Sequence, residues 1–157
     1  MPKITYQQYR DARQKEVNDL PLFFAFSREQ FEEELRKRNA TEKDVYKLLG
    51  SSGAFYLKKD APILRAAFSK KNILPELMQD HDFAVDAFLY EMNNHEYAIN
   101  WQADWDVCNC FCEKECIYGE DKTYVDYLKE AGHQDWIAAY KEAKRKHYKM
   151  AEENDWF

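Results

Sequence analysis

The pattern of polar and hydrophobic positions near the start of the chain marks two helix starts. Thr5 and Gln8 form a capping-box pair, and Ser27 and Gln30 repeat the same spacing. In a capping box the two side chains bond backbone amides of the first helical turn, which otherwise have no partner. The sequence therefore predicts two helices, over residues 5–19 and 27–38.

Two short hydrophobic runs, rich in aromatic residues, lie on either side of the second helix. Residues 21–26 and 53–57 are too short for helices and too aromatic for linkers, so each is predicted to be a strand. Before the second strand a short helix is predicted over residues 41–49, with Gly50 ending it in a left-handed conformation. The two strands can pair in one small sheet.

The second half of the chain has a mainly helical pattern. Residues 82–94 are hydrophobic on nearly every face, which is typical of a central helix. Residues 97–101 and 107–111 are interpreted as the two arms of a hairpin. Further helical segments are predicted over residues 61–71, 76–78, 121–131 and 134–151. The predicted fold class is α+β, a mostly helical single globular domain over residues 1–157 with a small antiparallel sheet.

Composition is that of a soluble globular protein. The length of 157 residues fits one domain, and hydrophobic residues make up 45%, which is enough for a core. The longest hydrophobic run is far shorter than the ~20 residues that a membrane span needs, and no secretory signal pattern opens the chain. We therefore expect a cytoplasmic protein without membrane association. A net charge of −6 argues against direct nucleic-acid binding.

Charge is distributed unevenly along the chain. No Lys or Arg stands between residues 72 and 113, and this stretch, called the acidic segment below, holds nine Asp and Glu residues. Residues 141–149 form an opposite, basic pole. Such runs are often solvated faces, but aromatic residues inside a charged patch are typical of binding surfaces. The candidate partner-binding residues are Glu91, Glu96, Trp101, Asp104, Trp105 and Asp106.

All four cysteines lie between residues 108 and 116. Zinc prefers four thiolate or imidazole ligands in a tetrahedron, and alternate residues of a strand would present their thiols on one face. Reduced thiols that pack as small hydrophobic side chains explain the same cluster, and so does a redox-sensitive pair. These three interpretations stay open. The candidate zinc ligands are Cys108, Cys110, Cys112 and Cys116.

A second constellation brings a histidine and carboxylates together. Glu91 and His95 are one helical turn apart, so both can reach one metal ion, with Asp104 or Asp106 completing the site. This arrangement suits a metal-dependent hydrolase, although it lacks the second histidine of the H-E-x-x-H motif. The alternative is that His95 ends the helix and bonds backbone groups there.

Four segments of the chain resemble a known family. They are Tyr6-Gln-Gln-Tyr-Arg-Asp-Ala-Arg-Gln-Lys, Leu20-Pro-Leu-Phe-Phe-Ala-Phe-Ser, Asn94-His-Glu-Tyr-Ala-Ile-Asn-Trp and Trp105-Asp-Val-Cys-Asn-Cys-Phe. Similar segments belong to small proteins of unknown function from gram-positive gut bacteria, their phages and other mobile elements. The resemblance implies an accessory protein carried on mobile DNA, and it transfers no catalytic residue. Proteins in that setting often act by binding, including as inhibitors of host defence nucleases such as CRISPR effectors.

The function expected from the sequence is therefore that of a small accessory protein of the mobile-element or phage type. It binds a protein with a basic surface, such as a nucleic-acid enzyme, through its acidic, aromatic-bearing surface. Inhibition of a host defence nuclease, in the manner of an anti-CRISPR protein, is one form of this function. The alternatives are a metal-dependent hydrolase that uses the histidine and carboxylate residues, and a structural zinc-binding module.

Overall fold

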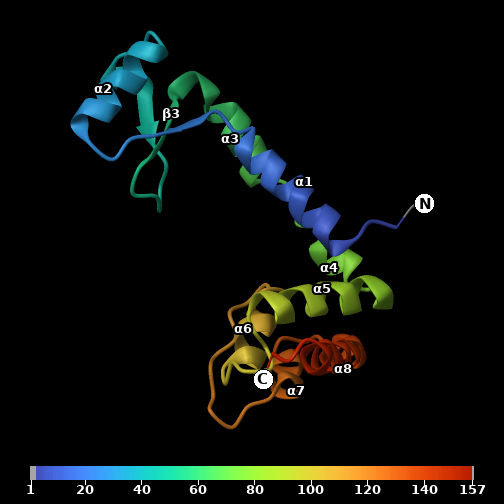
Figure 1. The fold of residues 1–157 in the computed structure, drawn as a ribbon. Coiled ribbons are helices and arrows are strands. Elements are labelled where there is room, and N and C mark those ends of the chain that lie inside the picture. The colour runs from blue at the N-terminus through green and yellow to red at the C-terminus, as the bar shows by residue number, and fades with distance from the viewer. Residues whose placement is uncertain (1–2, 157) are drawn as a thin grey trace. The chain divides into compact units, whose positions relative to one another are not determined.

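The computed structural model describes residues 3–156 and has a mostly helical α+β fold with one small antiparallel sheet, which confirms the predicted fold class (Figure 1). The described residues form eight α-helices: α1 (Tyr6–Asn18), α2 (Arg28–Lys37), α3 (Ala61–Phe68), α4 (Leu74–Leu77), α5 (His81–Asn94), α6 (Ala103–Asn109), α7 (Tyr124–Glu130) and α8 (Ile137–Glu153). The strands are β1 (Leu22–Phe24), β2 (Val45–Lys47) and β3 (Ala54–Leu57). Single 3-10 turns are η1 (Glu42–Asp44), η2 (Lys58–Asp60) and η3 (Gln134–Trp136). No helix within residues 3–156 has the length and hydrophobicity that crossing a bilayer requires.

The described residues divide into two compact units. We call residues 13–71 the sheet unit, and residues 3–12 together with 72–156 the helical unit. The single domain over residues 1–157 stays a prediction, because contacts within the chain do not report on independent folding.

In the sheet unit, β3 is the central strand and pairs antiparallel with β1 on one side and β2 on the other. Phe23 of β1 lies opposite Phe55 of β3, and the two rings stack with their centroids 5.8 Å apart. Phe31 of α2 packs against the same Phe55 ring, with a centroid distance of 4.9 Å. The strands predicted over residues 21–26 and 53–57 are confirmed, and their aromatic side chains join the sheet to α2.

The helix predicted over residues 41–49 is wrong beyond its first turn. The Asp44 carboxylate accepts the Thr41 amide at 2.9 Å and begins the 3-10 turn η1. From Val45 the chain continues as strand β2, which pairs with β3. A short isolated helix is only marginally stable, whereas a strand that pairs with β3 is stabilised by hydrogen bonds and by packing of its side chains. Gly50 has the predicted left-handed backbone, with φ +80°, but it lies in the turn between β2 and β3.

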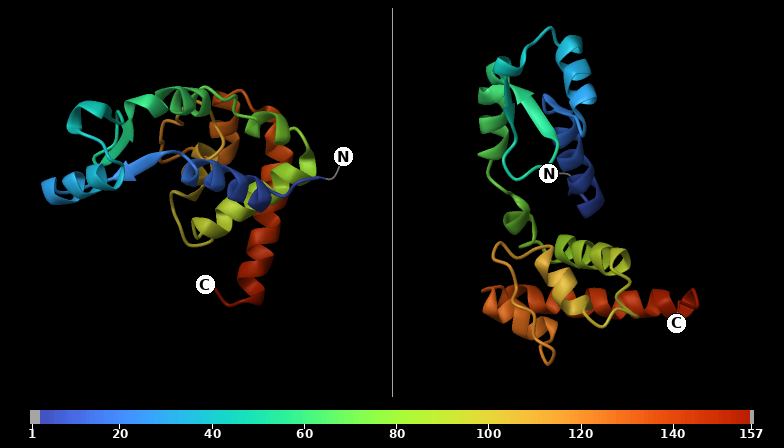
Figure 2. Two further views of the ribbon diagram at one scale, coloured as in Figure 1. Left: turned by 90° about the horizontal axis from the view of Figure 1, so that it is seen from above. Right: turned by 90° about the vertical axis from the view of Figure 1, so that its left-hand side faces the viewer.

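The helical unit is built around α5, as its hydrophobic pattern predicts. Figures 1 and 2 show α5 lying beside the long helix α8, against which it packs. Phe88 in the middle of α5 is fully buried, and its ring contacts that of Tyr140 from α8 with a centroid distance of 5.0 Å. Tyr6 of α1 and buried residues of α6 and α7 belong to the same core.

The hairpin predicted over residues 97–101 and 107–111 is wrong, because most of its second arm belongs to α6. The α6 residues Ala103, Val107 and Cys108 are all buried in the core of the helical unit. On a helix these three side chains share one face, whereas a strand would send the neighbours Val107 and Cys108 to opposite faces. Burial of all three in one core therefore favours the helix.

One histidine of α8, His147, is fully buried and uncharged. Its Nε2 accepts the Ala98 amide at 3.1 Å, so Nδ1 carries the proton and donates to Asn93 Oδ1 at 2.8 Å. Burial lowers the pKa of His147 below its ordinary value of 6.5. His147 is therefore protonated at a higher pH in the unfolded chain than in the folded protein. The contribution of His147 to stability is full above about pH 6.5 and is lost as the pH falls below that value.

His147→Gln is expected to reduce this loss of stability in acid. A glutamine amide can accept from Ala98 and donate to Asn93, but it does not titrate. The urea midpoint of the wild-type protein should fall between about pH 7.5 and about pH 5.5, and that of the variant should fall less. Equal losses in the two proteins would show that other groups set the acid sensitivity.

Candidate functional site

Three side chains of types that bind metal ions meet where α5 and α6 end. Glu91 lies in the last turn of α5, and His95 follows it by one turn, as predicted, as the residue that caps the end of this helix. Cys110 follows the last residue of α6. Glu91 Oε2 lies 3.4 Å from His95 Nε2 and 3.6 Å from Cys110 Sγ, and this sulfur lies 3.5 Å from His95 Nε2. Glu91 is only 1% exposed, while His95 and Cys110 reach the surface. We call these three residues the α5–α6 cluster.

The second oxygen of Glu91 is held from helix α1. Glu91 Oε1 accepts from Arg10 Nη1 at 2.6 Å and from the Tyr6 hydroxyl at 2.9 Å. Burial of a carboxylate is tolerated when an opposite charge and hydrogen bonds replace its lost hydration, and these two partners supply both. Burial raises the pKa of Tyr6, so its hydroxyl stays a donor. One oxygen of Glu91 is thereby fixed, and the other faces His95 and Cys110.

The four cysteines predicted as zinc ligands do not gather at one point. Cys110 belongs to the α5–α6 cluster, Cys112 is half-buried, and Cys108 is buried in the core. Across residues 3–156, the α5–α6 cluster is where three or more His, Cys, Asp or Glu ligand atoms converge. Burial, followed by the neighbouring Glu91 charge, raises the pKa of Cys110 to about 12. The four-cysteine site stays a prediction from the sequence.

The candidate partner-binding residues lie at very different depths. Trp101, in the turn before α6, is 79% exposed, and Glu96 is also exposed. The half-buried residues are Asp104, Trp105 and Asp106, all on α6. Glu91 is 1% exposed and lies on a buried face of the central helix α5, so it is not part of a surface that a partner meets in this structure. Its carboxylate belongs to the α5–α6 cluster, where it faces His95 and Cys110.

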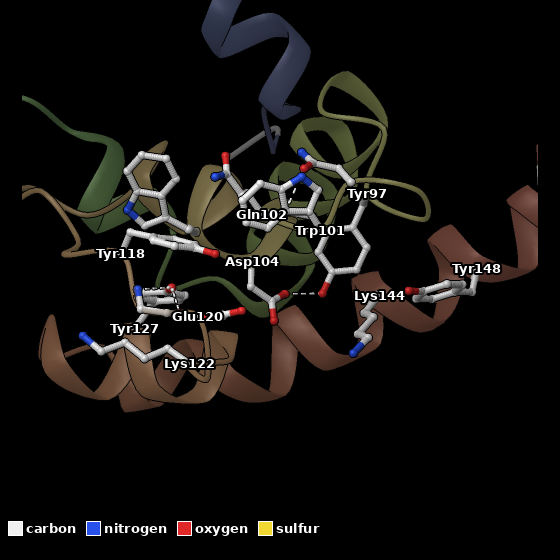
Figure 3. A pocket seen from close by; sticks show the side chains of 14 residues that line it. Tyr97, Trp101, Gln102, Asp104, Tyr118, Glu120, Lys122, Tyr127, Lys144 and Tyr148 are labelled. Atoms are coloured by element: carbon white, nitrogen blue, oxygen red, sulfur yellow. Dashed lines mark hydrogen bonds between the residues drawn. The ribbon is translucent and has the colours of Figure 1, made fainter.

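Asp104 accepts hydrogen bonds from three segments of the helical unit. Its Oδ1 accepts from the hydroxyl of Tyr97, drawn as a dashed line in Figure 3, and from that of Tyr140 at 2.8 Å. Its Oδ2 accepts from the backbone amide of Tyr124 at 3.0 Å. Burial raises the pKa of Tyr97 and of Tyr140, so both hydroxyls stay protonated donors. Asp104 therefore joins α6 to α7 and α8 rather than presenting its charge to a partner.

A hollow lies beside Trp101, between the turn before α6, the loop that precedes α7, and α8 (Figure 3). Trp101 meets the Tyr118 ring edge-on at a centroid distance of 6.0 Å, and Trp105 meets the same ring at 5.6 Å. Trp105 Nε1 donates to the Cys116 carbonyl at 2.7 Å, which fixes this indole. We call four residues on the rim of this hollow the Trp101 surface: Trp101, Gln102, Tyr118 and Glu120.

Sequence reasoning misses Arg10 and Tyr118, and it groups Cys110 with the other three cysteines instead of with Glu91 and His95. Arg10 stands among polar positions of its helix, and its partner Glu91 is far away in sequence. The one local signal is that Tyr6 and Arg10 are a single turn apart on α1, so both can reach the same group. The place of Cys110 beside Glu91 is not predicted because residues 107–111 are interpreted as a strand, and Tyr118 lies in a loop without periodicity.

The chain matches a protein family described as a family of unknown function (DUF7659) over residues 5–108. This match covers more than half of the chain, so the protein belongs to that family, and its resemblance to a family of unknown function is confirmed. Glu91 and His95 lie within the matched residues, whereas Cys110 and helices α7 and α8 follow them. Neither the curated proteins nor the solved structures give a match.

Proposed function

We propose that this protein acts by binding another protein through the Trp101 surface. The observation that supports this most is the 79% exposure of Trp101, a large side chain that is highly buried in most folded proteins. Trp is enriched among the few residues that carry most of the binding energy of an interface. Tyr118 packs edge-on against the Trp101 indole and limits its motion in the free protein. The side chain therefore loses less conformational entropy when a partner binds.

Covering Trp101 would supply a substantial part of the free energy of binding. An aromatic side chain buries about 150–250 Å², and hydrophobic surface is worth about 25 cal/mol per Å². Burial of the 79% of this indole that is exposed therefore contributes roughly 3–5 kcal/mol, which exceeds the roughly 2 kcal/mol, or about 30-fold in affinity, that marks a binding hot spot.

The partner is proposed to carry a basic surface. Exposed carboxylates of the acidic segment are Glu76, Asp80, Asp82, Asp86, Glu96 and Glu113. Two lysines also line the hollow beside Trp101, but both contact other groups of the protein. Lys122 pairs with Glu130 at 3.0 Å, and the Lys144 ammonium lies 5.5 Å from the centre of the Tyr124 ring. Of the acidic groups, Glu96 stands five residues before Trp101, and Glu120 belongs to the Trp101 surface itself. Carboxylates beside a docking residue attract a basic protein and repel nucleic acid.

Within this proposal the partner is a nucleic-acid enzyme, and a host defence nuclease of the CRISPR type is one example. Such enzymes attract nucleic acid through positively charged surfaces, and an acidic protein surface competes for the same charges. The mobile-element and phage setting is implied by the family resemblance described above. The protein would then be a small accessory inhibitor that blocks access of nucleic acid to its partner.

Trp101→Ala is expected to weaken partner binding by roughly 30-fold or more without loss of folding, because the variant removes an exposed ring. The wild-type protein, Trp101→Ala and Trp156→Ala, each tagged, are used to capture partners from host lysate, with and without nuclease. Trp156 is a matched control because it is 44% exposed and lies outside the Trp101 surface. We expect a protein that survives nuclease, weakens at high salt and is lost only with Trp101→Ala.

Two results of this capture would contradict the proposal. Equal recovery by all three proteins would place the binding surface elsewhere on the chain. Recovery that disappears on nuclease treatment would mean that nucleic acid, rather than a protein contact, links the partner to the bait.

A second candidate function is metal-dependent hydrolysis, which the convergence of Glu91, His95 and Cys110 favours. These residues would hold the ion, which would supply an activated water for hydrolysis of an ester or phosphodiester. The test is hydrolysis of p-nitrophenyl ester and phosphodiester substrates in the presence of zinc. Turnover that His95→Gln abolishes without unfolding the protein would support this function. A protein with bound zinc and no turnover above the buffer rate would exclude it for these substrates.

A further inference from the structure

The geometry of the α5–α6 cluster points to a metal site. We propose that Glu91 Oε2, His95 Nε2 and Cys110 Sγ bind a single zinc ion. The site does not depend on the Trp101 surface, and it differs from the four-cysteine site and from the Glu91, His95 and Asp106 site that the sequence suggests. The Asp106 carboxylate instead accepts from Asn100 Nδ2 at 2.8 Å.

The distances within the cluster match one face of a zinc tetrahedron. Zinc lies about 2.0 Å from oxygen, about 2.1 Å from nitrogen and about 2.3 Å from sulfur in protein sites. A tetrahedral angle at the metal then separates oxygen and nitrogen by about 3.3 Å, and separates sulfur from either of them by about 3.5 Å. The corresponding distances are 3.4 Å for oxygen to nitrogen, 3.5 Å for sulfur to nitrogen and 3.6 Å for sulfur to oxygen.

The same geometry argues against a nucleophile relay of cysteine, histidine and glutamate. In a relay the two imidazole nitrogens face different partners, one the nucleophile and the other the carboxylate. Here a single nitrogen, Nε2 of His95, faces both the Cys110 sulfur and the Glu91 carboxylate. The nitrogen-to-carboxylate distance of 3.4 Å is also longer than an ordinary hydrogen bond. Three ligand atoms that each lie within 3.6 Å of the other two are placed as ligands of one ion.

The groups around the cluster hold its carboxylate in place. Arg10 and Tyr6 both bond Glu91 Oε1, so the carboxylate cannot rotate freely and Oε2 stays directed toward the other two ligands. Outer partners of this kind orient metal ligands and are part of most metal sites. A carboxylate and a thiolate together balance the charge of a divalent ion, and a metal ion displaces the proton of a coordinating thiol.

The cluster supplies three protein ligands, and among the described residues no further His, Cys, Asp or Glu joins them. Zinc sites with three protein ligands keep their fourth position for water or substrate, whereas structural sites use four. His95 and Cys110 are reached by solvent, so an oxygen ligand can complete the tetrahedron. The class of ligand inferred for the fourth position is therefore a water molecule or a substrate oxygen.

Cobalt(II) is the direct probe of this site, because it replaces zinc in tetrahedral sites and makes thiolate coordination visible. We expect one equivalent of Co²⁺ to give the full, untagged chain a thiolate-to-cobalt charge-transfer band and the strong visible bands of tetrahedral geometry, with zinc displacing the cobalt. Cys110→Ser should remove the charge-transfer band. His95→Gln should weaken zinc binding, measured by calorimetry, by more than the roughly 10–100-fold that loss of an outer partner costs. Cys112→Ser is the matched control and should bind as the wild type does.

Several outcomes would overturn the proposal. One is a folded wild-type protein that takes up no cobalt or zinc. Another is binding that Cys110→Ser and His95→Gln leave unchanged. Loss of binding in Cys112→Ser would favour the four-cysteine site instead. Because both cluster variants change residues that reach the surface, circular dichroism of the metal-free proteins should show the wild-type fold and so separate lost binding from unfolding.

Discussion

Replacing Asp104 with alanine is expected to lower the free energy of unfolding by roughly 3–5 kcal/mol. The substitution removes the acceptor of two tyrosine hydroxyls and one backbone amide. Tyr140 is 0% exposed and Tyr97 is 5% exposed, so water cannot replace the lost acceptor without opening the core. Each buried donor left without a partner costs about 1–3 kcal/mol, and hydrogen bonds to a charged group are stronger than neutral ones.

Urea unfolding followed by tryptophan fluorescence measures this loss. Asp82→Ala is the matched control, because Asp82 is exposed and its contact with Lys3 is a long surface ion pair of 3.9 Å. The control should unfold at the same urea concentration as the wild type, while Asp104→Ala should unfold at a clearly lower one. Equal midpoints for all three proteins would contradict the role given to Asp104. Because this residue supports the fold, its charge reversal is not a test of partner binding.

Arg10→Ala is expected to destabilise the protein by roughly 2–4 kcal/mol, because it leaves the Glu91 carboxylate buried without its counter-charge. The value is below that of a fully buried pair because the Arg10 side chain is 43% exposed. Zinc should restore part of the loss, since an ion bound at Glu91 Oε2 supplies the missing positive charge and binds only the folded chain.

The matched control for this prediction is Arg13→Ala on the same helix. Arg13 pairs with Glu16 at 3.3 Å, and both side chains are about half exposed. An ion pair this exposed contributes little to the free energy of unfolding, so Arg13→Ala should have a urea midpoint close to that of the wild type. If the two variants unfold alike, the buried ion pair is not a major source of stability. If zinc raises the midpoint of neither Arg10→Ala nor the wild type, the link between Arg10 and the metal site is wrong.

The parts of the fold that the sequence predicts well depend on neighbours in the chain. Thr5 and Gln8 form the predicted reciprocal bonds, at 2.9 and 3.1 Å, and the Ser27 hydroxyl accepts the Gln30 amide at 3.1 Å. These capping contacts join residues only three positions apart in the sequence, so their residue types are sufficient to place the starts of α1 and α2. The same holds for α5, whose hydrophobic positions on nearly every face mark a central helix.

The parts that the sequence does not predict depend on what the segment packs against. Val45 and its neighbours form a strand because β3 offers an unpaired edge. Val107 and Cys108 lie on a helix because both side chains enter one core. Short hydrophobic segments of this kind suit either conformation, and tertiary contacts decide between them.

In the candidate sites, too, contacts between sequence neighbours are predicted and contacts between distant segments are not. The spacing of Glu91 and His95 predicts that they share one turn of helix, and the structure has them there. Cys110 joins them only because α6 is a helix that ends beside α5, and Arg10 reaches Glu91 from a helix 81 residues earlier in the chain. Trp101 is exposed, as a partner-binding residue has to be, whereas Glu91 is buried. Nothing beside Glu91 in the sequence indicates that its charge pairs with Arg10.

Hydrogen–deuterium exchange of the protein, free and bound to its captured partner, tests the central claim of a Trp101 surface most directly. The amides around Trp101 and those of the loop that carries Tyr118 and Glu120 are expected to exchange more slowly in the complex, while residues 13–71 exchange as in the free protein. Protection confined to the sheet unit, to the basic residues 141–149, or to no region near Trp101 would contradict the account.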